Sequence, residues 1–163
     1  MLPKEKGIFV GLGCVCGIAL SVLYHKIKMN NTDNSLISGV SHVGLSVKSI
    51  DTTYNFFTNL GYNKIGGNAE YPSIFVSNGN TIITIWAINS NNPIKFDRKN
   101  NTGLHHLALK VSSKDKLFEI YNKVKSFNGA KIEFKPELID ALGWWHFICY
   151  EPNGVRIEFT FHG

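Results

Sequence analysis

The sequence has few cysteines and few charged residues for a chain of 163 residues. Its three cysteines, Cys14, Cys16 and Cys149, are too few to form the disulfide framework of a small secreted domain. Charged residues make up 18% of the chain and hydrophobic residues 44%, which excludes a disordered tail, a collagen-like fibre and a highly charged coil. The length fits one globular domain with a short additional segment.

The net charge of +5 is distributed unevenly along the chain. Residues 1–28 contain four lysines and one glutamate, which give a net charge of +3. The remaining 135 residues contain 13 basic and 11 acidic groups, and they contain no basic cluster interleaved with aromatic residues. Because a nucleic-acid-binding surface needs concentrated positive charge, we expect no nucleic-acid partner.

One long hydrophobic run, Gly7 to Tyr24, contains no charged residue and has two lysines on each side. As a helix, its eighteen residues measure roughly 27 Å, close to the hydrocarbon thickness of about 30 Å. The run predicts a membrane anchor at residues 1–28 and a single-pass membrane protein of undetermined orientation. A cleaved signal or transit segment is the alternative, and a segment with neither role stays open. Residues 29–36 are predicted to be a polar linker.

The rest of the chain, residues 37–163, contains an internal repeat at an offset of 64 residues. His42 falls on His106, and the apolar and helix-start positions that follow each histidine coincide as well. Agreement of this kind at one offset indicates a duplicated supersecondary unit. The other coincident positions are Val43, Leu45 and Val47 with Leu107, Leu109 and Val111, Ser49 and Asp51 with Ser113 and Asp115, and Tyr54, Phe57 and Leu60 with Phe118, Tyr121 and Val124.

Each copy of the repeat has the pattern of one strand, one helix and three further strands. We therefore expect an α+β fold of two βαβββ modules, at about residues 37–90 and 103–163. The two modules are expected to form a curved mixed sheet with a central cavity, preceded by one transmembrane helix. The strand-like runs are 40–47, 62–65, 73–76 and 81–88 in the first copy, and 107–111, 131–135, 145–150 and 155–161 in the second.

Strand alternation places three residues with metal-binding side chains on faces turned away from the helices. His42 and His106 lie opposite the apolar positions of the first strand in each copy. Glu158 lies opposite Ile157 and Phe159 on the last strand of the second copy. If the two sheets curl together, these three side chains converge in the cavity. His105 is expected to face the helix, as a packing residue or a hydrogen-bond donor to a ligand.

These features resemble the vicinal oxygen chelate superfamily, which includes glyoxalase I, bleomycin-binding proteins, fosfomycin-resistance transferases and extradiol dioxygenases. The resemblance covers about residues 37–161. It rests on the two modules, the His-x-x-Leu/Val opening of each, and the ending Glu151-Pro-Asn-Gly-Val-Arg-Ile-Glu158. It implies that His42, His106 and Glu158 bind a divalent ion, and this donor set suits Fe, Mn, Ni or Zn. It also implies a homodimer.

The resemblance implies a metal-dependent lyase or transferase of the glyoxalase or fosfomycin-resistance kind. Its substrate is expected to be a small molecule that chelates the metal through two adjacent oxygens. Glu158 and His146 are the candidate catalytic residues, although the pattern does not fix which face His146 occupies. The alternatives are an Fe(II) extradiol-type dioxygenase and a metal-free ligand-binding module.

Two departures from the family pattern bear on these alternatives. Glyoxalase I has a fourth ligand, usually Glu, on the last strand of its first module, where Thr84 or Ile83 stands here. The dioxygenase signature is also incomplete, because Tyr150 directly precedes the Glu-Pro dipeptide. We predict that Thr84, Trp86 and Trp145 line the substrate pocket.

Overall fold

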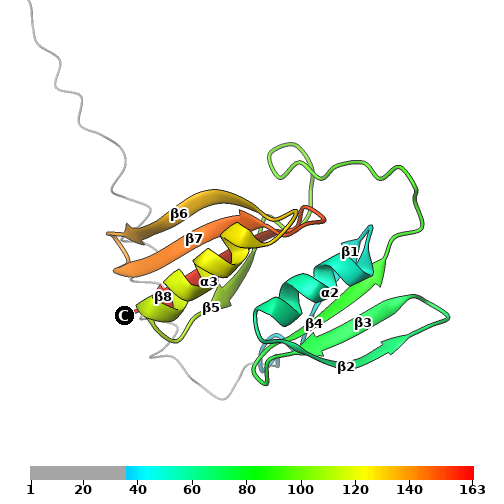
Figure 1. Cartoon of the computed structure of the whole chain (residues 1–163), viewed down its shortest axis with the longest axis horizontal. Helices are drawn as coiled ribbons and strands as arrows, with labels where there is room; N and C mark the ends of the chain where they lie inside the picture. Colours follow the sequence, from blue (N-terminus) through cyan, green and yellow to red (C-terminus); the bar gives the residue numbers. More distant parts are fainter. Residues whose placement is uncertain (1–35) are drawn as a thin grey trace, which may run out of the picture.

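A computed structural model describes residues 36–163 of the protein (Figure 1). These residues form two βαβββ modules, which confirms the predicted α+β class and the repeat. Module one contains β1 (Val43–Val47), α2 (Ile50–Asn59), β2 (Asn63–Asn68), β3 (Ser73–Ser77) and β4 (Ile82–Ala87). Module two contains β5 (Leu107–Lys110), α3 (Lys114–Ser126), β6 (Lys131–Ile139), β7 (Trp144–Tyr150) and β8 (Arg156–His162).

The two modules share one sheet topology. The strand order is β1-β4-β3-β2 in module one and β5-β8-β7-β6 in module two. The first and last strands of each module are parallel neighbours, and the other pairs are antiparallel. The register is the same in both modules, because Gly44 pairs with Thr84 as Ala108 pairs with Glu158. In each module, the first strand in sequence thus lies beside the last one.

The single curved sheet that we expected is not formed within residues 36–163, where the strands make two separate four-stranded sheets. The modules meet instead where α2 contacts the C-terminal end of α3 and the turn that follows β7. The rings of Phe56 and Phe127 lie 5.4 Å apart, edge to face. Thr53 Oγ1 donates to the buried carboxylate of Glu151 at 2.6 Å. These contacts join the modules through a helix and not through a shared strand ladder.

Each helix begins at a serine that caps its N-terminus. Ser49 Oγ accepts from the backbone N–H of Thr52, and Ser113 Oγ accepts from that of Lys116. Such a cap satisfies one backbone donor that the first turn leaves without a partner. The first helix ends before Gly61, whose φ of +90° lies in the left-handed region that glycine adopts without steric cost.

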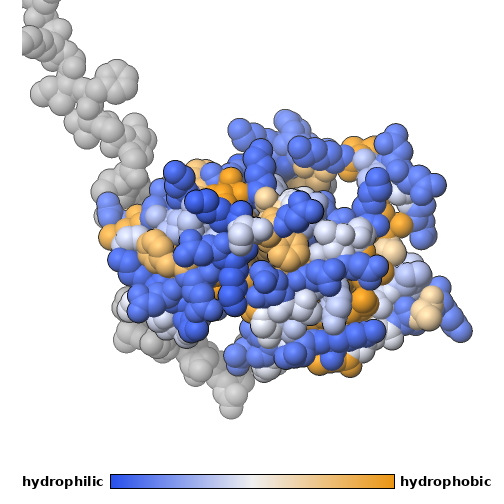
Figure 2. All heavy atoms as spheres, viewed as in Figure 1, coloured by the Kyte–Doolittle hydropathy of each residue, from blue (hydrophilic) through white to orange (hydrophobic). Residues whose placement is uncertain are grey.

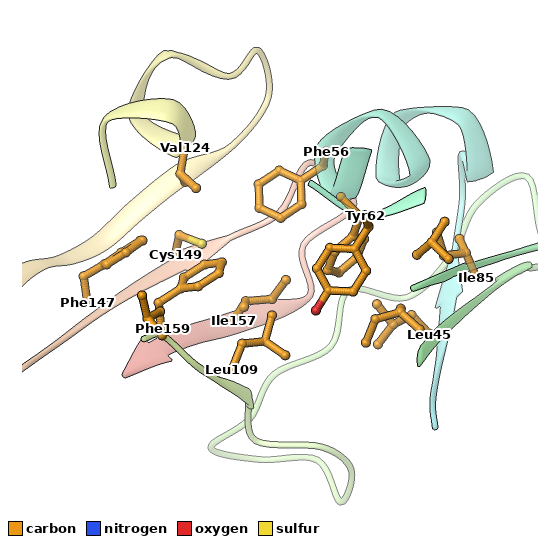
Figure 3. Packing of buried hydrophobic residues seen from close by; sticks show 14 of the residues in the cluster. Leu45, Phe56, Tyr62, Ile85, Leu109, Val124, Phe147, Cys149, Ile157 and Phe159 are labelled. Carbon is orange, nitrogen blue, oxygen red and sulfur yellow. The ribbon is translucent and has the colours of Figure 1, made fainter. Parts of the chain in front are cut away.

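The hydrophobic core extends through both modules. Figure 3 shows Phe56 of α2 between side chains of module two and those of module one. Phe56 and Phe57 are completely buried, as are Val124 and Phe147 of module two. The face of the molecule seen in Figure 2 is largely hydrophilic, with scattered hydrophobic patches. Each helix therefore buries one apolar side on its sheet and presents a polar side to solvent.

Half of the strand boundaries differ from the predicted ones by one residue, and three differ by more. The strand predicted at 62–65 extends to Asn68. The first strand begins at Val43 instead of residue 40, because its ladder with β4 begins at the pair of Val43 and Ile83. The strand predicted at 131–135 extends to Ile139. Two irregularities in its pairing with β7 interrupt the alternation that the prediction relied on.

The predicted membrane localisation is corrected by the structure. Within residues 36–163, no helix combines the length and the apolar character that a bilayer crossing requires. The longest helix there, α3, has 13 residues and is amphipathic. The run Gly7 to Tyr24, to which the transmembrane helix was assigned, and the linker up to residue 35 lie outside the described residues.

Candidate functional site

Polar side chains gather on one face of the module two sheet, which we call its helix-free face. This face carries Ala108, Ile148, Glu158 and the residues two positions along each strand from them. On β8, Glu158 alternates with Ile157 and Phe159, which are buried in the hydrophobic core. The predicted alternation therefore holds along β8, and Glu158 points away from the core.

His106 and Glu158 lie in contact on the helix-free face of module two. His106 directly precedes β5, and Glu158 is on the neighbouring parallel strand β8. His106 Nε2 lies 3.0 Å from Glu158 Oε2. The imidazole is 34% exposed and the carboxylate side chain 13%, so solvent reaches the pair from the histidine side.

The same carboxylate also contacts His146. His146 Nδ1 lies 2.6 Å from Glu158 Oε1, and His146 Nε2 lies 3.3 Å from Glu137 Oε1. The sequence pattern did not fix the face of His146, and the structure places it on the helix-free face, where it pairs with Thr160. Its side chain is only 13% exposed. Contacts at both ring nitrogens fix the orientation of the imidazole, and the first of them also orients the carboxylate.

His105 does not face the helix as expected. It is exposed, and its Nδ1 lies 2.8 Å from His106 Nδ1. Of the two expected roles, this position fits hydrogen bonding to His106 and not packing. Desolvation, followed by the positive charge of Arg156, lowers the pKa of His105 below its usual value. The neutral ring, with one donor and one acceptor nitrogen, is therefore favoured at neutral pH.

His42 lies in module one, away from this cluster. It is exposed, and its Nδ1 is 3.4 Å from the hydroxyl of Ser41. Within residues 36–163, the three predicted metal ligands His42, His106 and Glu158 do not form a metal-binding group. One chain thus brings together two of the three predicted metal ligands, His106 and Glu158, but not His42.

Thr84 and Trp86 of β4 alternate with the core residues Ile83 and Ile85, so they lie on the face of the module one sheet turned away from α2, the helix-free face of that module. Trp86 Nε1 donates to Thr84 Oγ1 at 2.9 Å. A side chain at Gly44, on the neighbouring strand, would lie 3.3 Å from Thr84 Oγ1, so the glycine leaves room for this pair. The shared register places Thr84, and not Ile83, at the position of Glu158. A hydroxyl therefore stands where glyoxalase I, by resemblance, has its fourth ligand.

The structure corrects the placement of Trp145. Its ring lies 5.9 Å from that of Phe118 on α3, and Lys114 Nζ lies 3.5 Å above it. Trp145 is therefore on the sheet face that α3 covers. Adjacent residues of a strand point to opposite faces, so Trp145 and His146 cannot line the same surface.

Two carboxylates near the site were missed by the sequence analysis. Glu137 contacts His146, and Glu133 binds both Arg98 and Arg156. Both glutamates lie on β6. The irregular pairing of this strand hides the alternation that would have placed Glu133 and Glu137 on the helix-free face. Arg98 lies in the segment between the modules, which has no periodicity, and no sequence signal could have paired it with Glu133.

The residues present fit a divalent metal in part. An imidazole nitrogen and a carboxylate oxygen 3.0 Å apart are suitable donors for Fe, Mn, Ni or Zn. His146 supplies the outer hydrogen bond that commonly orients a metal-binding carboxylate. A third protein donor must come from elsewhere, because the chain does not bring His42 to this pair.

A protein-family model described as the Glyoxalase/Bleomycin resistance protein/Dioxygenase superfamily matches residues 39–159. No curated protein matches the sequence significantly.

Solved structures share the fold at low sequence identity. A glyoxylase/bleomycin resistance protein/dioxygenase domain from Frankia sp. EAN1pec is 21% identical, with a TM-score of 0.68 over 78% of this chain and 93% of that one. The lactoylglutathione lyase from Agrobacterium tumefaciens is 15% identical, with a TM-score of 0.58 over 78% and 96%. A mutant of the fosfomycin resistance protein FosX from Listeria monocytogenes, complexed with Mn(II) and 1S,2S-dihydroxypropylphosphonic acid, is 18% identical, with a TM-score of 0.59 over 76% and 90%. At these identities the likeness shows the fold alone.

Proposed function

Because this chain belongs to the Glyoxalase/Bleomycin resistance protein/Dioxygenase superfamily, we propose that it is a metal-dependent enzyme. Its substrate is a small molecule that chelates a divalent ion through adjacent oxygens. The reaction belongs to the glyoxalase-like or fosfomycin-resistance-like group of lyases and transferases. The observation that carries the proposal is the 3.0 Å contact of His106 Nε2 with Glu158 Oε2 on the helix-free face of module two.

His42 of a second copy completes the metal site in this proposal, which makes the protein a homodimer. His42 occupies the position in module one that His106 occupies in module two, and it is exposed. The two sheets of one chain are separate, so His42 of the same chain does not join the pair. Two imidazoles and one carboxylate leave positions on the ion for two substrate oxygens.

The residues around this pair have distinct proposed roles. A bound divalent ion supplies Lewis acidity, which polarises the coordinated oxygens of the substrate. Glu158 is both a ligand and a catalytic residue, and His146 holds it through the 2.6 Å contact. His146 is also the candidate general acid or base, and it would exchange a proton at Nε2, which lies 3.3 Å from the exposed carboxylate of Glu137. Thr84 and Trp86, which lie in module one with His42, line the substrate side of the site from the second copy.

Metal analysis of the full chain tests the proposal. We expect about one divalent ion per chain after reconstitution, and a loss of binding in Glu158→Ala and His106→Ala, since each removes a donor. Elemental analysis and titration calorimetry measure both quantities. The metal-dependent proposal fails if neither the purified nor the reconstituted protein binds a divalent ion. The ligand assignment fails if His106→Ala leaves the affinity unchanged.

A mixing experiment tests the site between two copies. His42→Ala and His106→Ala chains are co-expressed with different tags, and the mixed dimers are compared with dimers of either variant alone. A shared site restores about one quarter of the wild-type metal sites, because half of randomly assembled dimers are mixed and each regains one of two sites. Absence of any recovery in isolated mixed dimers contradicts the shared site.

A substrate panel identifies the reaction class. The panel contains the methylglyoxal–glutathione adduct, fosfomycin with a thiol, and catechols with oxygen. Turnover of the first or second by the metal-loaded protein, with loss of turnover in His146→Ala, supports the proposal. Oxygen consumption on catechols by the Fe(II) form would assign it to the dioxygenases instead.

A further inference from the structure

The chain contains two arginines against fifteen lysines, and both arginines bind the same carboxylate. Arg98 Nη2 donates to Glu133 Oε1 at 3.0 Å, and Arg156 Nε donates to Glu133 Oε2 at 2.6 Å. The hydroxyl of Tyr150 donates to Glu133 Oε1 at 3.3 Å. These four residues come from β6, β7, β8 and the segment between the modules, and we call them the arginine cluster.

A structured turn presents Arg98 to the cluster. Asp97 organises this turn, because its Oδ1 accepts from Lys99 N at 2.8 Å and its Oδ2 accepts from Asn100 Nδ2 at 2.6 Å. The backbone N–H of Lys99, followed by the side chain of Asn100, lowers the pKa of Asp97 below its usual value. Asn101 N also donates to the backbone oxygen of Asp97 at 2.8 Å. Arg98 is thus held against the sheet by a hydrogen-bonded turn.

The arginine cluster carries one positive charge that its own carboxylate does not balance. Two guanidinium groups share the single carboxylate of Glu133, and the side chain of Arg156 is only 8% exposed. Arg98 Nε is buried and has no hydrogen-bond partner within residues 36–163. Burying a charged donor without a partner is costly, so a further acceptor beside the two guanidinium groups would stabilise the cluster.

The arginine cluster lies beside the candidate metal site. Leu107 pairs with Ile157 in the parallel ladder, and His106 and Arg156 each directly precede one member of that pair. Arg156 is two residues from Glu158 on β8, so both lie on the helix-free face. Glu158 already contacts His106 and His146, so it is engaged away from the arginines.

We propose that Arg98 and Arg156 form a binding site for an oxyanion, and that this site recognises an anionic group of the substrate beside the metal. Guanidinium groups suit this role, because their planar donors match the oxygens of carboxylates and phosphates and stay charged at any physiological pH. Arg98 is the accessible member, since 23% of its side chain reaches solvent. The assignment as a substrate subsite rests on the proposed function, whereas oxyanion binding itself does not. The substrate class is therefore a metal-chelating molecule that also carries a carboxylate, phosphonate or phosphate.

Nuclear magnetic resonance on the metal-free full chain tests the oxyanion site. With two arginines in the chain, two Nε–H signals report directly on the cluster. Inorganic phosphate is titrated into the protein in the presence of a chelator. Acetate, a planar oxyanion, is titrated in a parallel experiment, and chloride at equal ionic strength is the control. We expect both signals to shift saturably with phosphate. A shift with acetate as well would identify carboxylates as ligands, and a shift with phosphate alone would restrict the site to tetrahedral oxyanions.

Three variants separate binding from a structural role. Arg98→Gln should weaken phosphate binding about 10- to 100-fold, the loss expected for a charge-assisted contact. Lys99→Gln, the matched control, removes the same charge from an exposed neighbour and should retain the wild-type affinity. Arg98→Lys keeps the charge without the planar fork and should lie between them.

Two outcomes overturn the proposal. One is the absence of saturable shifts of either signal in wild-type protein, which needs no variant to fold. The other is an Arg98→Gln protein that melts at a lower temperature but binds phosphate like wild type. This result would show that the cluster only holds the segment between the modules against the sheet. Because the titration excludes metal, failure of metal binding and failure of oxyanion binding are measured separately.

Discussion

The helix-free faces of the two modules differ in chemistry although their strands pair in the same register. In module two, Glu158 lies opposite Ala108, and His146 is one strand further on. In module one, Thr84 holds the position of Glu158, and Ser73 holds that of His146. At these two positions the duplicated fold therefore carries ionisable groups in one copy and hydroxyl groups in the other. In the proposed site, module two therefore supplies the catalytic residues and module one lines the substrate side.

The helices of the two modules differ as well. In α2, Phe56 and Phe57 are completely buried, and Phe56 also packs on Phe127 of module two. In α3, the residue at the position of Phe56 is Ile120, which is partly buried. The first helix therefore stabilises its own sheet and the contact between modules, whereas the second serves mainly its own sheet.

The largest expected effect tests this difference between the helices. Phe56→Ala should lower the free energy of unfolding by about 3–5 kcal/mol, because it leaves a cavity at a fully buried site. Ile120→Ala, at the equivalent position of module two, should cost less because that side chain is partly buried. Urea unfolding of both variants measures the difference. Equal losses would show that α2 is no more deeply anchored than α3.

The next effect tests the difference between the helix-free faces. His146→Ala should weaken divalent metal binding roughly 10- to 100-fold, because it removes an outer hydrogen bond to the proposed ligand Glu158. Ser73→Ala is the matched change in module one and should leave metal affinity as it is. Titration calorimetry with Mn(II) compares the two. Retention of full affinity in the histidine variant would remove His146 from its positioning role.

Ser73→Ala also has an expected effect on stability. The hydroxyl of Ser73 is buried and has no hydrogen-bond partner among residues 36–163. Removing an unsatisfied buried hydroxyl should leave the free energy of unfolding unchanged or raise it by up to about 1 kcal/mol. Thermal unfolding measures this change, and a clear loss of stability would indicate that the hydroxyl has a bound partner such as water.

A small effect is also expected where the two modules agree. Cys149 of module two occupies the position of Val76 in module one, and both are completely buried. Cys149→Val should therefore change the free energy of unfolding by less than about 1.5 kcal/mol. A larger loss in urea unfolding would show that packing at this position is specific to each module.

The same cysteine should resist alkylation in the folded protein. Burial, followed by the negative charge of Glu151, raises the pKa of Cys149 to about 12. The thiol is therefore protonated in the folded state at neutral pH, and the reactive thiolate is absent. The raised pKa favours folding below the unfolded-state pKa of about 8.5, and this contribution is lost as the pH rises toward 12. Mass spectrometry after iodoacetamide treatment should find Cys149 modified only when the protein is unfolded.

The sequence predicted the modules and the face of Glu158, because both depend on local periodicity. Alternation along β8 separates Glu158 from Ile157 and Phe159, and the offset of 64 residues relates His42 to His106. Such patterns need no knowledge of how distant segments pack.

The remaining features depend on pairing that periodicity does not encode. Phe134 and Glu137 are three residues apart, yet they pair with Ile148 and His146 on one face, because the ladder is irregular between them. Strict alternation forbids this arrangement. The contact of Arg98 with Glu133 and the position of α2 against module two are long-range, and only the folded chain specifies them.

The parallel pairing of β5 with β8 has a consequence for folding. Parallel neighbours cannot be joined by a tight turn, so the chain must close a loop that contains α3, β6 and β7 before this ladder forms. Closing such a loop carries an entropic cost and slows folding. His106 and Glu158 stand at the two ends of that loop and meet only when it has closed. A ligand bound by both residues would therefore stabilise the closed loop, and with it the folded state of the whole module.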